Sequence, residues 1–154
     1  MDSLPKVKDY MARDLIVLAP QENVYDALTK LINQRISGAP VIEDGKLVGV
    51  LSERDCLSLI ANGSFYDHAT GIVRDFMSRI VHQVDPEMDI FEVANRFMHY
   101  NYRRFPVVQD GKIIGQISRG DVIRAISKES LKLKTEKQHD SGYLSEEMKG
   151  ALKD

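Results

Sequence analysis

Cysteine, long apolar runs and an N-terminal targeting signal are what this sequence lacks. It has one cysteine, Cys56, in 154 residues, so neither an internal disulfide nor an all-cysteine metal site can form. No apolar run approaches the roughly 20 residues that a membrane-spanning helix needs. The first residues, MDSLPKVKDYMARD, lack the apolar core of a signal peptide. These absences predict a cytoplasmic protein without a membrane segment, in a compartment that keeps thiols reduced.

Charge of one sign and catalytic motifs are also scarce. The chain has 21 Lys and Arg against 23 Asp and Glu, a net charge of −2, so no overall charge draws it to DNA or to an anionic membrane. Its four histidines lack the spacing of metal ligands, and neither a P-loop nor a nucleophile elbow is present. Cys56 falls beside apolar residues, so we expect it to be buried and unreactive. With no candidate catalytic residues, we expect a protein that is not an enzyme.

What the sequence does contain is an internal repeat. The phrase PVIEDGKLVGVLS at residues 40–52 returns as PVVQDGKIIGQIS at residues 106–118. The same offset of 66 residues aligns Met11 with Met77. An offset that holds without a gap over about 50 residues indicates a duplicated unit. One such unit is too small to bury an adequate core, so we expect the two to pack together about an approximate two-fold axis.

Each copy predicts the same succession of elements. A short apolar stretch is followed by a helix whose cap is Asn23 in the first copy and Asp89 in the second. Two β-rich runs then flank an Asp-Gly dipeptide, which favours a tight hairpin turn, and a second helix follows. The predicted fold class is α+β, with two βαββα units. The predicted apolar stretches are residues 15–18 and 80–84, and the predicted second helices are residues 53–61 and 119–127. The predicted boundaries are residues 7–62 for repeat 1, 63–76 for the linker, 77–128 for repeat 2 and 129–154 for the tail.

The paired endings of the two copies resemble a known family. GVLSERD at 49–55 and GQISRGD at 115–121, with GAPVIEDG, RFPVVQDG and the Met-to-Pro segments MARDLIVLAP and MSRIVHQVDP, are similar to the tandem CBS-domain (Bateman module) family over residues 7–128. The resemblance implies a stand-alone regulatory pair without catalysis, which forms flat homodimers. It also implies that no cofactor is required and that AMP, ADP, ATP, NAD, S-adenosylmethionine or a cyclic dinucleotide binds in the clefts between the repeats.

The residues themselves suit such a ligand at two equivalent places. Ser52 and Ser118 each precede an apolar helical run, and a helix start exposes N–H groups that favour phosphate. Asp55 and Asp121, one turn further on, can accept hydrogen bonds from ribose hydroxyls, as acidic residues do in dinucleotide-binding folds. The alternative is that Ser-x-x-Asp is a capping box that needs no ligand. The repeat does not separate the two, because duplicated helices keep duplicated caps.

Two further sets of residues are candidates through the resemblance. At the start of a predicted strand, Pro40 and Pro106, with Ala39 and Phe105 before them, would line an adenine or ribose pocket. Their alternative roles are to begin the strand, where a missing N–H costs least, and to fill the core. The other pocket wall would contain Val17 and Gln83, where many family members carry Thr, so a polar contact from this strand is in doubt.

The two copies differ in charge beside the repeated phrase. Copy two has Arg103, Arg104 and Arg119, and guanidinium groups bind phosphate through paired donors; a solvated surface patch is the alternative. Copy one has Ser37, Gly38 and Glu53 at the equivalent positions, and Glu53 would repel phosphate. We therefore expect the phosphates near the three arginines and the stronger site at Asp121, whereas copy one is either the weaker site or prefers a less charged ligand.

The tail leaves the repeat after residue 127. We expect Ser141-Gly142 to break it and Ser145 to cap a short helix over 146–152. The tail is then either a frayed end or an arm that packs on a second subunit. The apolar residues of such an arm would be Tyr143, Leu144, Met148 and Leu152.

The function that these features favour is an energy-sensing module that binds a small-molecule adenosyl nucleotide and signals to a separate, unidentified protein. One rival is a structural dimerisation module with vestigial clefts. A second rival is a nucleic-acid-binding protein that uses the arginines at 103–104 and 119–124. The net charge and the few aromatic residues between those arginines argue against that rival.

Overall fold

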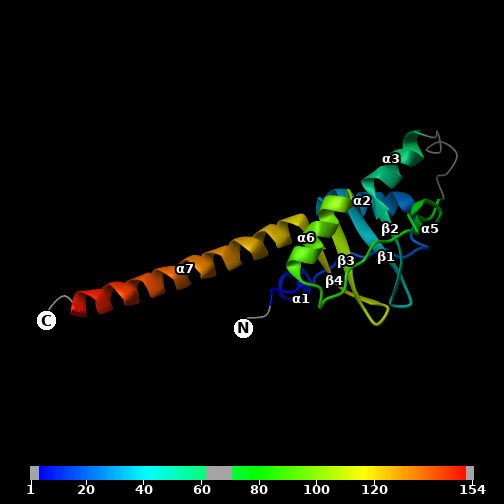
Figure 1. The fold of residues 1–154 in the computed structure, drawn as a ribbon. Helices are drawn as coiled ribbons and strands as arrows, with labels where there is room; N and C mark the ends of the chain where they lie inside the picture. Colours follow the sequence, from blue (N-terminus) through cyan, green and yellow to red (C-terminus); the bar gives the residue numbers. More distant parts are fainter. Residues whose placement is uncertain (1–3, 62–70, 152–154) are drawn as a thin grey trace.

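The computed structural model describes residues 4–61 and 71–151 of the chain, with side chains described up to residue 139. The fold consists of helices and one antiparallel sheet of four strands, so the predicted α+β class is confirmed (Figure 1). The elements are α1 (Val7–Tyr10), α2 (Val24–Gln34), β1 (Gly38–Glu43), β2 (Lys46–Ser52), α3 (Glu53–Ala61), α5 (Val73–Phe76), α6 (Ile90–His99), β3 (Arg104–Gln109), β4 (Lys112–Ser118) and α7 (Arg119–Ala151).

The predicted helix caps and hairpin turns are confirmed. The Asn23 side chain accepts hydrogen bonds from the N–H groups of Tyr25 and Asp26, at 2.9 and 3.2 Å. Asp89 caps α6 by accepting from the N–H of Glu92 at 2.9 Å. Both hairpin turns have two successive residues with positive φ. These are Asp44 at 51° and Gly45 at 77°, and Asp110 at 53° and Gly111 at 77°. Two such residues match the twist of the flanking strands, which is why Asp-Gly specifies the turn.

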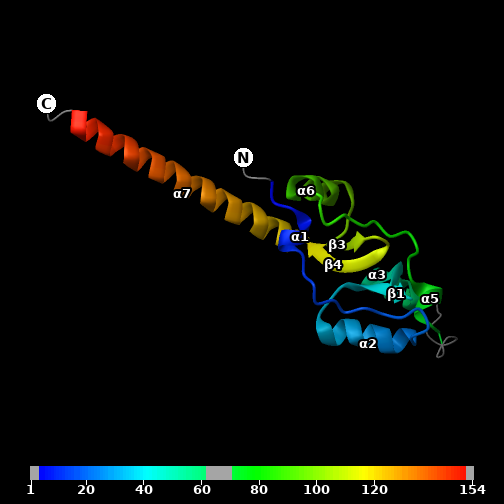
Figure 2. The same cartoon turned by 90° about the horizontal axis from the view of Figure 1, so that it is seen from below.

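The two hairpins meet at only one end of the sheet. The strand order is β1-β2-β4-β3, yet β2 and β4 pair only at Lys46 and Lys112, beside the two turns. Figure 1 shows these turns side by side, and Figure 2 shows α2 and α6 at opposite ends of the body. Farther along, Ala12 pairs with Gln116 of β4 and Ser78 pairs with Val50 of β2. The inner edges of the central strands are therefore held by other segments, not by each other.

The first segment of each repeat packs in the core of the other repeat. Val7 and Met11 pack in one core cluster with Phe105 and Ile117 of the second repeat. In the same way, Val73 belongs to the core of the first repeat, together with Leu18, Val41 and Leu51. The linker predicted at 63–76 therefore needs a correction: residues 73–76 form α5 and pack in this core, whereas residues 63–70 lie outside the described residues. Sequence alignment of the copies identifies equivalent segments but does not show which core each one enters.

The predicted first strands are reduced to single bridges. Leu18 forms a parallel bridge with Val41, and Val84 forms one with Val107. These two residues are buried, whereas Val17 is 42% exposed. The prolines that follow, Pro20 and Pro86, lack the N–H group that a longer ladder would require.

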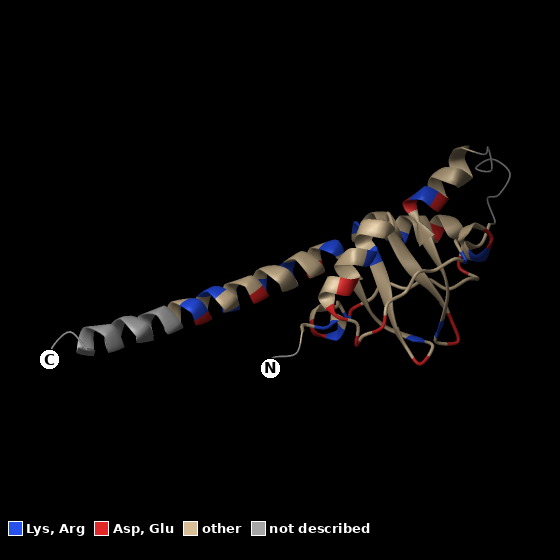
Figure 3. Ribbon diagram, viewed as in Figure 1, with Lys and Arg blue, Asp and Glu red and all other residues tan. Residues whose placement is uncertain are grey.

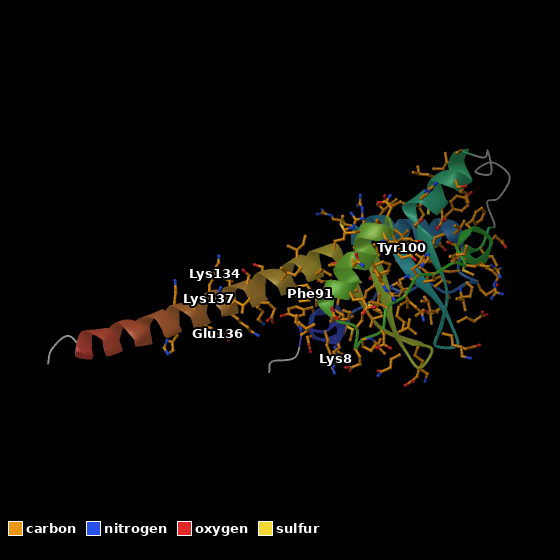
Figure 4. All side chains as sticks on the ribbon, viewed as in Figure 1. Lys8, Phe91, Tyr100, Lys134, Glu136 and Lys137 are labelled. Carbon is orange, nitrogen blue, oxygen red and sulfur yellow. The ribbon has the colours of Figure 1, made fainter. Side chains whose placement is uncertain are left out.

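The prediction that the last repeat helix ends at Ser127 and that Ser141-Gly142 breaks the tail is wrong. Helix α7 runs without a break from Arg119 to Ala151, a length of about 50 Å. A glycine in a helix costs only about 1 kcal/mol, and Lys, Glu, Leu and Gln around it favour the helix. Beyond Ser127 the helix projects from the body, as the labelled Lys134, Glu136 and Lys137 show (Figure 4). The side chains proposed for an arm, from Tyr143 onward, lie outside the described side chains.

Two glycines allow the exchanged segments to approach the central strands. A Cβ added at Gly49 would lie 2.6 Å from the sulfur of Met77 and 2.8 Å from the carbonyl oxygen of Ser78. At Gly115 it would lie 2.6 Å from the sulfur of Met11 and 2.9 Å from the carbonyl oxygen of Ala12. Because part of each clash is with backbone, it is not relieved by moving a side chain alone.

Replacing either glycine by alanine is expected to destabilise the fold. Gly49→Ala and Gly115→Ala should each lower the free energy of unfolding by about 1–3 kcal/mol, the usual cost of overpacking, as measured by urea denaturation. Gly120→Ala is the matched control. Its Cβ would meet only Arg124 Nη1 at 3.4 Å and Ser118 Oγ at 3.7 Å, and alanine favours the helix. A loss for Gly120→Ala as large as for Gly115→Ala would contradict this explanation.

An ion-pair cluster also holds α1 on the second repeat. Glu87 accepts from Lys6 at 2.6 Å and from Lys8 at 2.7 Å. The hydrogen bond from Lys6, followed by that from Lys8, lowers the pKa of Glu87 from 4.5 to about 2. A carboxylate whose pKa is lower in the folded state stabilises the fold above its unfolded pKa, and this contribution disappears as the pH falls toward the folded pKa.

Glu87→Gln is therefore expected to show a pH-dependent loss of stability. The variant should unfold at a lower urea concentration than the unmodified chain at pH 7. The difference should shrink as the pH falls from about 4.5 to about 2. Because both lysines are exposed, 1 M salt should also reduce the difference at pH 7. A difference that is the same at pH 7 and pH 2 would assign the effect to packing and not to charge.

Candidate functional site

A cavity of about 320 Å³ lies on the axis that relates the two repeats. Equivalent residues of both copies line it in pairs, as expected where a two-fold axis passes. The space opens because β2 and β4 separate beyond their single pairing at Lys46 and Lys112. The paired residues are Pro40 with Pro106, Val50 with Gln116, Ser37 with Arg103, and Gly38 with Arg104.

A second cavity, of about 360 Å³, extends this space on the side of Asp55. The two cavities share Ser52, Arg54 and Arg104, and the second adds Asp55 of α3 and His82 of the second repeat. We call the combined space the Asp55 cleft. Its walls are Ser52, Arg54, Asp55, Val81, His82, Tyr102, Arg103, Arg104 and Pro106, with Ala39, Pro40 and Glu53 at the axis.

Ser52 and Asp55 form the start of α3. The N–H and the hydroxyl of Ser52 donate to Asp55 Oδ2, at 2.8 and 2.9 Å, and the N–H of Asp55 donates to Ser52 Oγ at 3.2 Å. The capping alternative raised by the sequence is therefore present. It uses one carboxylate oxygen. Among the residues that the structure describes, Asp55 Oδ1 has no hydrogen-bond partner, so this oxygen is free to accept from a ligand hydroxyl.

The equivalent pair in the second repeat is engaged on both oxygens. Ser118 N–H donates to Asp121 Oδ2 at 2.8 Å, and Asp121 N–H donates to Ser118 Oγ at 3.1 Å. The other oxygen, Asp121 Oδ1, accepts from the guanidinium of Arg124 one turn along α7. The first repeat has Ser58 at the position of Arg124, and a serine brings no charge to Asp55.

The arginines predicted at the phosphate site are divided between two places. Arg103 and Arg104 line the space that Ser52 also lines. The Nε atom of Arg104 is buried and, within the described part of the chain, has no hydrogen-bond partner. Arg119 instead lines a groove between α6 and α7, and its Nε donates to the carbonyl oxygen of Tyr102 at 2.7 Å. Arg54, which the sequence analysis did not select, faces the Asp55 cleft.

Aromatic rings form the wall that the second repeat contributes. His82 lies 4.3 Å from Tyr100 and 5.4 Å from Tyr102, between ring centres. Phe105 lies beneath them, 1% exposed and 4.5 Å from Phe97, so it belongs to the core. His82 and Tyr102 line the cleft, and flat rings of this kind can stack on a base.

The remaining candidates lie apart from the cleft. Val17 lines neither cavity. Gln83 is exposed, and its carbonyl oxygen accepts from Arg96 at 3.3 Å. The residues that sequence reasoning missed, Arg54, His82 and Tyr102, stand where the other copy has Gly120, Ile16 and Ile36. Comparison of the copies position by position would have drawn attention to them.

Other kinds of site find little support in the described residues. Burial raises the pKa of the Cys56 thiol, and the carboxylates of Asp55 and Glu53 raise it further, so the thiol is protonated at neutral pH; its predicted burial is confirmed. Over the described side chains, residues 4–61 and 71–139, there is no cluster of His, Cys, Asp and Glu that could hold a metal ion. None of the described helices is long and apolar enough to span a membrane. Basic and acidic residues alternate along the ribbon (Figure 3).

Comparison with known proteins shows that both repeats are similar to CBS domains. A model of the CBS domain matches the chain twice, at residues 7–62 and 73–128. The structure of CBSX2 of Arabidopsis thaliana in complex with AMP is similar to this chain with a TM-score of 0.73 and 34% identity, over 82% of this chain and 98% of that one.

Two sequence relatives show how much of a protein such a match can cover. The uncharacterized protein MJ1426 of Methanocaldococcus jannaschii is 30% identical over 152 residues, covering 78% of this chain and 90% of that protein. The A-adding tRNA nucleotidyltransferase of Aquifex aeolicus is 32% identical over 129 residues, covering 83% of this chain but 15% of the enzyme. The matched segment therefore occurs both as most of a protein and as a small part of an enzyme.

Proposed function

Because the chain belongs to the CBS-domain family, we propose that it is a regulatory module that binds an adenosine nucleotide between its two repeats. The observation that carries the proposal is the Asp55 cleft. It brings together a helix start with a carboxylate oxygen and guanidinium groups that have no hydrogen-bond partner among the described residues. These are the groups that recognise ribose and phosphate. The AMP complex of the similar CBSX2 supports the same ligand class.

Regulation would follow from the way the cleft is shared. Ser52 and Asp55 come from the first repeat, whereas Tyr102 and Arg104 come from the second. A ligand that contacts both favours one relative arrangement of the repeats, and only such a difference in affinity can shift a conformational equilibrium. We propose that this shift is passed to a separate protein, that the module is not itself a catalyst, and that it works in the cytoplasm.

The two rival functions have weaker support. A nucleic-acid-binding protein would gather basic residues on one face, whereas basic and acidic residues are interspersed here (Figure 3). A scaffold with vestigial clefts would fill its clefts with its own side chains. Instead, open cavities of about 320 and 360 Å³ make up the Asp55 cleft.

A panel of adenosyl ligands tests the proposal. AMP, ADP, ATP, NAD, S-adenosylmethionine and cyclic di-adenosine monophosphate would each be added to the full chain, and the melting temperature measured. A ligand at a hundred times its Kd stabilises by about 2.7 kcal/mol, which for a chain of this size is a rise of about 5–10 °C. We expect at least one adenosine nucleotide to give this rise.

A double variant serves as the control for that panel. Asp55→Asn combined with Asp121→Asn removes both carboxylates but keeps, at each position, a side-chain oxygen that can accept from the N–H of Ser52 or Ser118. The double variant should lose the ligand-dependent rise, and GMP should give none with either protein. A flat panel for the unmodified chain would favour the scaffold. Binding of oligonucleotides that weakens steeply with salt would favour the nucleic-acid-binding protein.

An exposed apolar face supports the homodimer that the resemblance implies. Both repeats expose the same three positions, one on the helix before the hairpin and two on the helix after it. Met98 is 85% exposed and Ile123 67% exposed. Repeated apolar faces on one chain are self-complementary surfaces of the kind that a two-fold symmetric dimer uses. The face consists of Ile32, Leu57 and Ile60 in the first repeat and of Met98, Ile123 and Ile126 in the second.

Met98→Glu is expected to separate such a dimer into monomers. Sedimentation analysis should show a dimer for the unmodified chain and a monomer for the variant at the same micromolar concentration. Because Met98 is exposed, the charge should leave the fold intact, and the circular dichroism spectrum should not change. Leu131→Glu, at a position 61% exposed on the projecting part of α7, is the matched control and should remain dimeric. Dissociation by Leu131→Glu alone would assign the contact to the α7 arm.

A further inference from the structure

We infer that only one of the two equivalent clefts is a nucleotide site, namely the Asp55 cleft, and that it selects ligands that carry a phosphate. The inference rests on the proposed function and adds to it which cleft is used and which ligands are favoured. It differs from the expectation drawn from sequence alone, which gave the stronger site to Asp121. The two repeats carry different residues at the equivalent positions around their clefts.

Side chains that could bind a nucleotide gather on one side of the axis. Arg54 faces the Asp55 cleft, and the second repeat has Gly120 at that position. Arg104 reaches the cleft from β3, where the first repeat has Gly38. A guanidinium therefore enters the Asp55 cleft from each repeat, and the equivalent positions around Asp121 are glycines.

The rings of the cleft follow the same division. His82 and Tyr102 line the Asp55 cleft, 5.4 Å apart between ring centres. The residues that would stand beside Asp121 by the same symmetry are Ile16 and Ile36. Isoleucine packs against a base, but it lacks the flat face on which a base stacks.

The carboxylates show the same asymmetry in their free atoms. Both oxygens of Asp121 are engaged, one by the N–H of Ser118 and the other by Arg124. A ribose hydroxyl that donates to Asp121 would therefore share an oxygen with Ser118 or compete with Arg124. At Asp55, the helix cap occupies Oδ2 alone, so a ribose hydroxyl can donate to Oδ1 without breaking an existing bond.

The charges that face the Asp55 cleft favour an anion. Arg54, Arg103 and Arg104 line it, against the carboxylates of Glu53 and Asp55. Asp55 is already held by Ser52, and Arg104 Nε is a buried donor without an acceptor among the described residues. A phosphate would be attracted by the three guanidinium groups that line the cleft. The uncharged thioether of 5′-methylthioadenosine would not, and the sulfonium cation of S-adenosylmethionine would be repelled.

Calorimetric titration with two ligands that share the adenosine moiety tests the inference. AMP and 5′-methylthioadenosine would each be titrated into the full chain. We expect one AMP per chain and weaker binding of 5′-methylthioadenosine. Arg54→Gln and Arg104→Gln should each lower the affinity for AMP about ten-fold, the effect of losing one charge-assisted hydrogen bond. Both variants should leave the affinity for 5′-methylthioadenosine within two-fold, which a merely structural effect would not do.

Three further variants make the test sharper. Asp55→Asn should lower the affinity for AMP at least ten-fold, and the identical change at the equivalent position, Asp121→Asn, should leave it within two-fold. Glu53→Gln should raise the affinity for AMP, because it removes a negative charge from the cleft, and should not affect 5′-methylthioadenosine. Arg119→Gln, in the separate groove between α6 and α7, should leave both affinities unchanged.

The outcomes distinguish this inference from the proposed function. Two AMP molecules per chain, a loss at Asp121→Asn in place of Asp55→Asn, or equal losses for both ligands in the arginine variants would overturn the inference and leave the proposed function in place. Failure of both ligands to bind any of these proteins, with the whole adenosyl panel also flat, would overturn the proposed function and the inference with it.

Discussion

The close approach of a methionine-bearing segment to a glycine, made twice, is the contact on which the rest of the structure depends. Met77 and Ser78 lie against Gly49, and Met11 and Ala12 lie against Gly115, with no room for a Cβ. These approaches let each repeat place its first segment along the central strand of the other. The two cores therefore contain residues from both ends of the duplication, and neither repeat has a complete core by itself.

The cleft is a consequence of the same exchange. The central strands do not pair with each other at Val50 and Gln116. Instead their backbone groups bond to Ser78 and Ala12, and the central strands separate beyond Lys46 and Lys112. The fold thus makes a symmetric opening at almost no cost in unpaired backbone. Side chains that the two copies do not share, above all Arg54 and Arg104, then make the opening asymmetric.

Interactions between residues close in the sequence could be predicted, whereas the packing of distant segments against each other could not. Asn23, Asp44 and Ser52 act on neighbours within a few residues, so a cap, a turn and a capping box follow directly from their types. The destination of Arg104 depends on how the repeats are placed against each other, which the offset of 66 residues does not contain. The unbroken course of α7 was not predicted for another reason. Ser141-Gly142 was expected to end the helix, but a glycine costs a helix only about 1 kcal/mol and weakens it without ending it.

The length of helix α7 has a consequence for motion at the end of the chain. It begins at Arg119, next to the strand end that carries Ser118, and most of its length of about 50 Å lies outside the body (Figure 1). A stiff rod of that length converts a rotation of about 5° at its base into a displacement of roughly 4 Å at its tip. Small rotations of the second repeat would therefore produce larger displacements at the far end of α7. Another molecule that binds there would respond to them.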